Sequence, residues 1–514
     1  MPKTPSIRVY SLIKSMTAAE KRYFNVFIGS SEGDNKYRRL FDAIDLQPVF
    51  DDEALAQAVY PGESIESRKY SELKGYLYQL ILKSLQSYDE HTSIDYQLKR
   101  QLQSIRVLFK RARYEDCRSI ILKTKKLAYQ YEDFTSVVEL LNWEKQVAYA
   151  EMDVAFFDNQ LVRIDEEEKT CLRLLSNLSD YRNIFFKLYI SIRTQNFLRN
   201  EDKIAYLKGM IQQPLLQEAG QAQSHLAKVL YYRIYTLYYY SLLDIGQFYY
   251  SGRQLLDVME SKPLLLQEDT SSYISALSNF TLSCGLLDKY AEVNACLQKF
   301  KGIKPKTLDD EIKIHRSYYT YLFGLCIYTG DFEAGVLALQ QHFEESQKLD
   351  SQLFETSSFY FQYFYIYFGA KDYDKALLYL NRWLGLPKSI DRQDMQSLAK
   401  IINLMLHYEL GNYMLLEYLL RSTYRYLQQR ERLLEFERRI LVFIRASQKF
   451  KTAKELKQGF SQLREGLIEL SSIPSEEAML RYFDIVAWLE SKITDRDFAT
   501  VVQQNYQAKL IINH

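Results

Sequence analysis

Aromatic residues recur at a nearly constant interval along most of this 514-residue chain, and this spacing constrains the fold more than any other feature. Most follow a small or polar pair, as in Gly330-Asp331-Phe332 and Gly411-Asn412-Tyr413. Neighbouring members are 37 to 43 residues apart, except for one gap of 91 that leaves room for a further unit near Ile204. The series is Tyr114, Phe157, Phe248, Tyr290, Phe332, Tyr373, Tyr413 and Phe450. A period of this length indicates a repeat architecture.

The residues around each aromatic predict two helices joined by a bend. Leu or Ile stands seven residues after most of the aromatics, and a small residue such as Gly335 often stands three residues after. These spacings share one helix face, so the aromatic opens the buried stripe of a second helix. Pro263, Pro305 and Pro387 follow 14 or 15 residues after an aromatic, where proline ends a helix. An apolar helix precedes the bend, for example over 317–328, which gives repeats of about 41 residues.

Asp331 has two interpretations. It could be an acid, a base or a metal ligand in a functional loop, or it could be a turn residue beside a glycine that accepts a positive φ. The sequence favours the turn, because isolated acidic residues are common in turns.

The pattern resembles the tetratricopeptide repeat over about residues 95–470. Gly330-Asp331-Phe332 with Gly335, and Asp372-Tyr373 with Ala376, match that family's bend, aromatic and small-residue columns. The match is degenerate, since the repeats are longer than the family's and Leu416 replaces the small residue in one of them. The resemblance implies an all-α, right-handed α-solenoid of about nine helix-turn-helix repeats.

The same resemblance implies a binding groove, because the first helices of tetratricopeptide domains line the concave face. Tyr and Arg are common anchors of protein interfaces. The positions carried over to the groove are Arg233, Thr236, Tyr240, Thr320, Tyr328, Phe361, Tyr365 and Tyr408. Packing between repeats is the alternative role for about half of these aromatic rings.

The two ends of the chain depart from the repeat. Residues 1–94 are predicted to form a helical N-terminal domain or cap, in which Thr17 and Glu20 form a capping box that opens a helix. Residues 95–474 form the predicted solenoid. Residues 475–514 are predicted to be capping helices, because a solenoid must cover its last apolar face.

The motifs of catalysis are weak. Gly29-Ser30-Ser31-Glu32-Gly33 matches the nucleophile elbow of hydrolases, but it follows a predicted helix instead of the strand that this chemistry requires. The six histidines never stand three or four residues apart, which disfavours a helical metal site. Cysteines such as Cys284 and Cys326 share one repeat column, as small core residues would. No catalytic, cofactor-binding or metal-binding residue is predicted, and the chain is expected not to be an enzyme.

Charge is uneven along the chain although the formal net charge is only +1. Residues 99–126 hold ten Lys or Arg against two acids, and residues 132–168 hold eleven acids against two basic residues. The first stretch could bind phosphates and the second a basic partner. The alternative, which the sequence favours, is that the two are solvated faces of adjacent hairpins and neutralise each other.

The remaining expectations concern compartment and function. No apolar run is long enough to span a membrane, no secretory signal is visible, and five cysteines without a Cys-x-x-Cys pair fit a reducing compartment, so a cytoplasmic protein is expected. The favoured function is a non-enzymatic scaffold that binds a protein or peptide segment in the aromatic groove. The alternatives are a regulator that contacts nucleic acid through the N-terminal helices and residues 99–126, and an enzyme without a recognisable motif.

Overall fold

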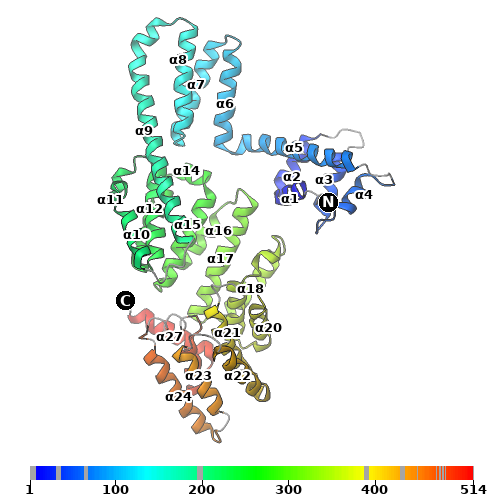
Figure 1. Ribbon diagram of the computed structural model, residues 1–514, viewed down its shortest axis with the longest axis vertical. Coiled ribbons are helices and arrows are strands. Elements are labelled where there is room, and N and C mark those ends of the chain that lie inside the picture. Colours follow the sequence, from blue (N-terminus) through cyan, green and yellow to red (C-terminus); the bar gives the residue numbers. More distant parts are fainter. Residues whose placement is uncertain are drawn as a thin grey trace. The chain divides into compact units, whose positions relative to one another are not determined.

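The structure is a computed structural model that describes residues 7–512, apart from 30–35, 63–66, 194–200, 387–392, 429–433, 448–449, 471, 474–475, 477–479 and 481. Over these described residues all regular secondary structure is helical, with no β-strand (Figure 1). The all-α fold class predicted from the aromatic spacing is therefore confirmed. The number of repeats and the membership of the tetratricopeptide family stay predictions.

The helices follow one another through short connections. The first part of the chain forms α1 (Arg8–Ser15), α2 (Ala18–Phe27), α3 (Lys36–Leu46), α4 (Asp52–Val59), α5 (Ser67–Thr92), α6 (Ile94–Phe109), α7 (Tyr114–Gln130), α8 (Phe134–Ala150), α9 (Val154–Arg193), α10 (Glu201–Ile211), α11 (Pro214–Gln217), the 3₁₀ helix η2 (Ala219–Gln221), α12 (His225–Ser241), α13 (Ile245–Glu260) and α14 (Pro263–Glu268). The second part forms α15 (Thr270–Leu286), α16 (Tyr290–Gly302), α17 (Leu308–Thr329), α18 (Phe332–Ser346), η3 (Ser351–Phe354), α19 (Ser357–Gly369), α20 (Tyr373–Leu384), α21 (Gln393–Glu409), α22 (Tyr413–Gln428), α23 (Glu435–Ser447), α24 (Ala453–Leu470), α26 (Ile485–Thr494) and α27 (Phe498–Ile512).

The chain groups into two compact units. The first unit is Met1–Ser283 with Ile303–Glu311, and the second unit is Cys284–Gly302 with Ile312–His514. This division falls inside the predicted solenoid, within α15 and α17. The domain boundaries predicted at 94/95 and 474/475 stay predictions.

The first unit begins with five helices around a small core of their own. Their buried apolar side chains run from Val9 in α1 to Ile81 in α5. The capping box at the start of α2 is present, since the hydroxyl of Thr17 accepts from the amide of Glu20 at 3.2 Å and the carboxylate of Glu20 accepts from the amide of Thr17 at 2.6 Å. The sequence-based assignment of this helix start is confirmed.

One kind of bend joins many of the successive helices. Its central residue has a positive φ, and the next amide often donates back to a carbonyl five residues earlier, as from Asp133 to Ala128 at 2.9 Å. This is the Schellman ending of an α-helix. An Asp at that next position then caps the following helix, as Asp331 does by accepting from the amide of Ala334 at 3.1 Å. The left-handed residues at these bends are Ala112, Glu132, Met152, Leu243, Asp288, Gly330, Lys371 and Gly411. Asp331 is therefore a capping residue of the bend, as the sequence predicted.

Non-glycine residues in this left-handed conformation are strained, which gives a stability prediction at Ala112. Ala112 is exposed and has a φ of 54°. A Cβ costs roughly 1 kcal/mol in this conformation, so Ala112→Gly should raise the free energy of unfolding by about 0.5–1 kcal/mol. Ala205 is also exposed but lies inside α10. Ala205→Gly should therefore lower the free energy of unfolding by about 1 kcal/mol. Denaturant titrations that rank the two substitutions in the opposite order would contradict the bend geometry.

The predicted repeat register holds at most positions and slips at a few. The second helices begin at Tyr114, Tyr290, Phe332, Tyr373 and Tyr413, as predicted. Elsewhere they begin at Val154 and Ile245, each three residues before the expected aromatic, and at Ala453, three residues after Phe450. Residues three positions apart lie on the same helix face. Phe157 and Phe248 therefore match the aromatic spacing although they lie one turn inside their helices.

The 91-residue gap in the repeat has a structural cause. The segment from Val154 to Arg193 is a single helix, α9, where two shorter helices and a bend would continue the pattern. Its first half contributes Ile164 and Cys171 to the core of α6–α8, and its second half contributes Leu178 and other residues to the core formed with α12. A bend aromatic is therefore absent from the middle of this region.

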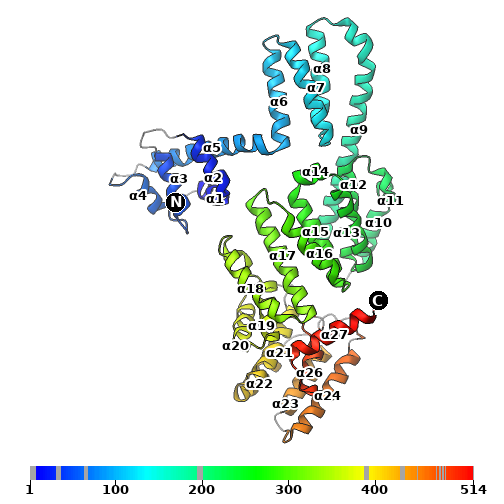
Figure 2. The same ribbon diagram turned by 180° about the vertical axis from the view of Figure 1, so that it is seen from behind.

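The second unit has one continuous core from Tyr319 to Val502. Its last two helices, α26 and α27, return to earlier helices of the same unit (Figure 2). The ring of Phe498 stacks on Phe332 at 5.8 Å between centroids, and the Gln503 side chain donates to the Gly330 carbonyl at 3.0 Å. Tyr506 meets Tyr290 at 5.5 Å. The C-terminal helices therefore pack along several hairpins of the unit.

Candidate functional site

Three of the predicted groove residues lie on α12 in the first unit. Arg233 is half-buried and donates weakly to the hydroxyl and carbonyl of Ser272, both at 3.3 Å. Burial lowers the pKa of Arg233, an effect that Asp269 partly offsets. Thr236 is buried, and its hydroxyl donates to the Tyr232 carbonyl of its own helix. Tyr240 is exposed and touches Phe248.

The other five predicted groove residues lie in the second unit, and only Tyr328 among them is well exposed. Tyr365 is only 5% exposed. Phe361 and Tyr408 are half-buried and pack on tryptophans, at 5.2 Å from Trp383 and 6.1 Å from Trp488 respectively. Thr320 is also half-buried, and its carbonyl accepts from Gln362.

The C-terminal helices explain why Tyr365 and Tyr408 are covered. The ring of Tyr365 lies 4.8 Å from that of Phe483, and its hydroxyl accepts from the amide of Asp484 at 3.0 Å. Glu409, next to Tyr408, accepts from the Trp488 indole at 2.6 Å and from Lys492 at 2.7 Å. The chain's own segment from Phe483 onward therefore occupies the place that the sequence had given to a partner. The assignment of the eight residues to a groove stays a prediction, with Thr236 and Tyr365 among them buried.

Three of the ten basic residues in 99–126, all in the first unit, pair with acids of 132–168. Arg118 on α7 contacts both Glu151 and Asp153 at the α8–α9 bend. Lys125 lies 2.6 Å from Glu144 and 3.5 Å from Glu167, both partners being well shielded from water. On the acidic side, Lys145 pairs with Glu168 and Arg106 with Glu139. These pairs follow the mutual neutralisation that the sequence favoured, and they lower the charge available to a phosphate-binding strip.

A groove that the sequence did not predict lies at the ends of α6, α8 and α9. Its volume is about 430 Å³, and its lining residues are Phe109, Lys145, Gln146, Tyr149, Ala150 and Phe157. Phe109 is held in place by Trp143 and Tyr114, at 5.4 and 5.5 Å between ring centroids. Tyr149, by contrast, is 79% exposed at the rim. An exposed aromatic beside an apolar groove is unusual for a surface that meets only water. The one sequence signal was Phe157, which had been counted as a bend aromatic.

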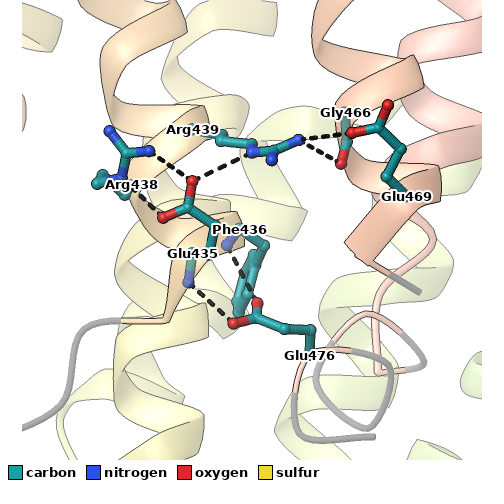
Figure 3. A network of polar contacts seen from close by, with 7 residues as sticks. All are labelled: Glu435, Phe436, Arg438, Arg439, Gly466, Glu469 and Glu476. Carbon is teal, nitrogen blue, oxygen red and sulfur yellow. Dashed lines mark hydrogen bonds and ion pairs between the residues drawn. The ribbon is translucent and has the colours of Figure 1, made fainter. Parts of the chain in front are cut away.

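A polar network in the second unit joins α23 to α24 (Figure 3). The Glu476 carboxylate accepts from the amides of Glu435 and Phe436 at 2.9 and 3.1 Å, which caps the first turn of α23. Arg438 and Arg439 both donate to Glu435, and these bonds lower its pKa to about 2. The partners of Glu435 and Glu476 are an arginine pair and two backbone amides, so these contacts have a structural explanation in the capping and joining of helices.

A second network is buried between α17, α18 and α19. His315 and His342 share a hydrogen bond of 2.9 Å, and His342 also bonds to the hydroxyl of Tyr363. Glu345 accepts from Tyr319 at 2.9 Å and lies 3.6 Å from His315. With both imidazoles neutral, Tyr363 can donate to His342 and His342 to His315, which leaves the Nδ1–H of His315 at 3.6 Å from Glu345. The two histidines stand 27 residues apart, so no helical spacing in the sequence pointed to their contact.

This histidine pair makes stability depend on pH. Burial, and secondarily the neighbouring His315, lower the pKa of His342 to about 3. The unfolded chain, with a His pKa near 6.5, binds a proton that the folded chain rejects, so stability falls as the pH drops below about 6.5. From pH 7 to pH 5 this group alone should lower the free energy of unfolding by about 2 kcal/mol. His342→Phe should reduce this change in unfolding free energy between pH 7 and pH 5, whereas Tyr363→Phe should keep it. Urea titrations at both pH values measure the change. An equal change in the parent protein and both variants would contradict the assignment.

The other candidate sites from the sequence are not supported in the described part of the chain. No group of three or more His, Cys, Asp or Glu side chains there could hold a metal ion. All five cysteines lie in described residues, are buried and form no disulfide, as small core residues do. Most of the Gly-x-Ser-x-Gly match, Ser30 to Gly33, lies outside the described residues. None of the described helices is both long and apolar enough to cross a membrane.

Comparison with known proteins adds a likeness to a solved structure. No protein-family model matches the sequence, and no curated protein matches it. Among solved structures, the apo form of RapI is similar, with 14% sequence identity and a TM-score of 0.39 over 78% of this chain and 99% of that one.

Proposed function

We propose that this chain is a non-enzymatic scaffold that binds a segment of another protein, and that the groove at the ends of α6, α8 and α9 is its binding site. The observation that supports this function is the groove's combination of an ordered aromatic floor at Phe109 and an exposed rim at Tyr149. Interfaces gain most of their energy where an aromatic side chain fills such a site and water leaves. The proposal moves the binding site from the predicted tyrosine face to this groove.

A photo-crosslinking experiment tests this proposal. Tyr149 is replaced by benzoylphenylalanine in the full chain, and adducts formed in the native host are identified by mass spectrometry. One dominant protein adduct is expected from this position, and Ala150→Trp should abolish it because the larger side chain fills the groove.

The matched control is Tyr250, an exposed tyrosine on α13. The same reagent at Tyr250 should not produce the adduct seen at Tyr149. Identical adducts from both positions, or an adduct that survives Ala150→Trp, would show that the groove is not a binding site.

A further inference from the structure

The first half of α9 presents an unusual outer face. Val154, Leu161 and Leu172 are exposed there, about a quarter of a turn around the helix from the buried Ile164 and Cys171. Spacings of seven and eleven residues put the three apolar side chains in one row along the helix. A row of exposed apolar side chains is typical of a surface that is covered by another helix.

Acidic side chains lie in and beside this row. Asp158 and Asp165 stand between its apolar members, and Glu166 stands next to Asp165. Asp158 and Glu166 are exposed and make no ion pair within the described residues, while Asp165 meets Lys169 in an exposed pair that contributes little. The acids toward α7 and α8 differ, because Glu167 and Glu168 are already paired with lysines. The outer face of α9 therefore carries acidic side chains without ion-pair partners among the described residues, whereas those of the inner face are neutralised by lysines.

The row continues into the groove. Phe157 follows Val154 by one helical turn and lines the groove together with Tyr149 and Ala150. Met152, at the bend between α8 and α9, is 85% exposed beside them. The apolar surface thus runs from the groove along the first half of α9. We call this combined surface the α9 edge: the groove with Val154, Asp158, Leu161, Asp165, Glu166 and Leu172.

We propose that the α9 edge docks an amphipathic helix of a partner protein in which apolar residues alternate with Lys or Arg along the contact face. This inference rests on the proposed scaffold function and specifies its partner. Apolar side chains of such a helix would pack between those of α9, as ridges into grooves, and one could enter the pocket at Phe157. Its basic residues would meet Asp158, Asp165 and Glu166. The same acids would repel an acidic helix, so the charge selects the partner while the apolar row supplies contact area.

Two designed peptides test the charge preference. Both are helical with leucines on one face, and the flanking positions carry lysine in one and glutamate in the other. Fluorescence anisotropy with the full chain should show the lysine peptide binding about tenfold or more tightly than the glutamate peptide, with a preference that weakens as salt increases. Equal affinity for the two peptides, or no binding of either, would overturn the proposal.

Matched charge reversals locate the site. Asp158→Lys/Glu166→Lys should weaken the lysine peptide by about tenfold and strengthen the glutamate peptide. The control Glu344→Lys/Glu465→Lys reverses two exposed acids of the second unit by the same total charge and should change neither affinity. If both pairs of substitutions weaken the lysine peptide equally, the effect depends only on the net charge of the protein, and the proposed site is wrong. Val154→Ser/Leu161→Ser should also weaken the lysine peptide, which separates docking from simple ion attraction.

The two experiments can fail separately. A partner crosslinked from Tyr149 whose binding survives Asp158→Lys/Glu166→Lys would keep the scaffold function and overturn the basic helix. If Ala150→Trp leaves specific binding of the lysine peptide unchanged, the charged row of α9 docks the peptide and the groove takes no part in docking.

Discussion

Gly369→Ala is expected to lower the free energy of unfolding of the second unit by about 3 kcal/mol. Gly369 ends α19 where the ring of Phe332 lies directly against its backbone. An added Cβ would stand 2.3 Å from two atoms of that ring, which is far closer than van der Waals contact. Phe332 is buried under Phe498 and Tyr365, so the ring cannot move away without disturbing the core. Denaturant titration of the full chain measures the loss.

A second glycine provides the control for this prediction. Gly324 lies inside α17 of the same unit, and a Cβ there would meet no atom within 4 Å. Gly324→Ala should therefore raise the free energy of unfolding by about 0.5–1 kcal/mol through helix propensity. Reducing the ring with Phe332→Leu should lessen the cost of Gly369→Ala, because the two side chains would no longer overlap. A stable Gly369→Ala protein would contradict the packing of the bend aromatic.

Tyr365→Ala is expected to cost about 4 kcal/mol of unfolding free energy, the typical loss for a large aromatic deleted from a core. Its ring is buried against Phe483, and the hydroxyl accepts from the amide of Asp484. Deleting the side chain leaves both a cavity and an unpaired amide at the start of α26. The result expected is loss of the C-terminal helices' packing, seen as a lower denaturation midpoint and faster amide exchange in α26 and α27.

Two further tyrosine substitutions separate the parts of this effect. Tyr365→Phe keeps the ring and loses only the acceptor, so about 1–2 kcal/mol should be lost. Tyr328→Ala removes a half-exposed tyrosine of a neighbouring first helix and should cost much less than Tyr365→Ala. If Tyr365→Ala instead left the protein as stable as the parent, Tyr365 would be available to a partner, as the sequence had suggested.

The repeat could be predicted from sequence because its physics is local. A bend needs a residue that accepts a positive φ, then a cap such as Asp331, then an apolar residue that opens the next stripe, and these signs lie within a few positions. These local signs gave a wrong prediction where a helix does not follow the repeat spacing, as in α9. Nothing near Arg173 could show that α9 continues without a bend, since a helix interior carries no marker of its own length.

The site was harder to predict because it depends on contacts between distant segments. Tyr365 looks the same in the sequence whether water, a partner or Phe483 covers it. The paired charges were easier, since Lys125 and Glu144 belong to adjacent hairpins whose order the repeat had already given. The groove at Phe109 needed the ends of three helices to be placed together, which no periodic pattern specifies.

The continuous helix α9 also affects how the first unit can unfold. Stacked repeats usually open one at a time, since each touches only its neighbours. A 40-residue helix, about 60 Å long, that carries side chains of two cores joins them by covalent backbone without a flexible bend. Unravelling one core would cost helical hydrogen bonds that the other core also depends on, because helix formation is cooperative. Two groups of hairpins that would otherwise melt independently should thus behave as a single cooperative block, with one transition and shared protection of their amides.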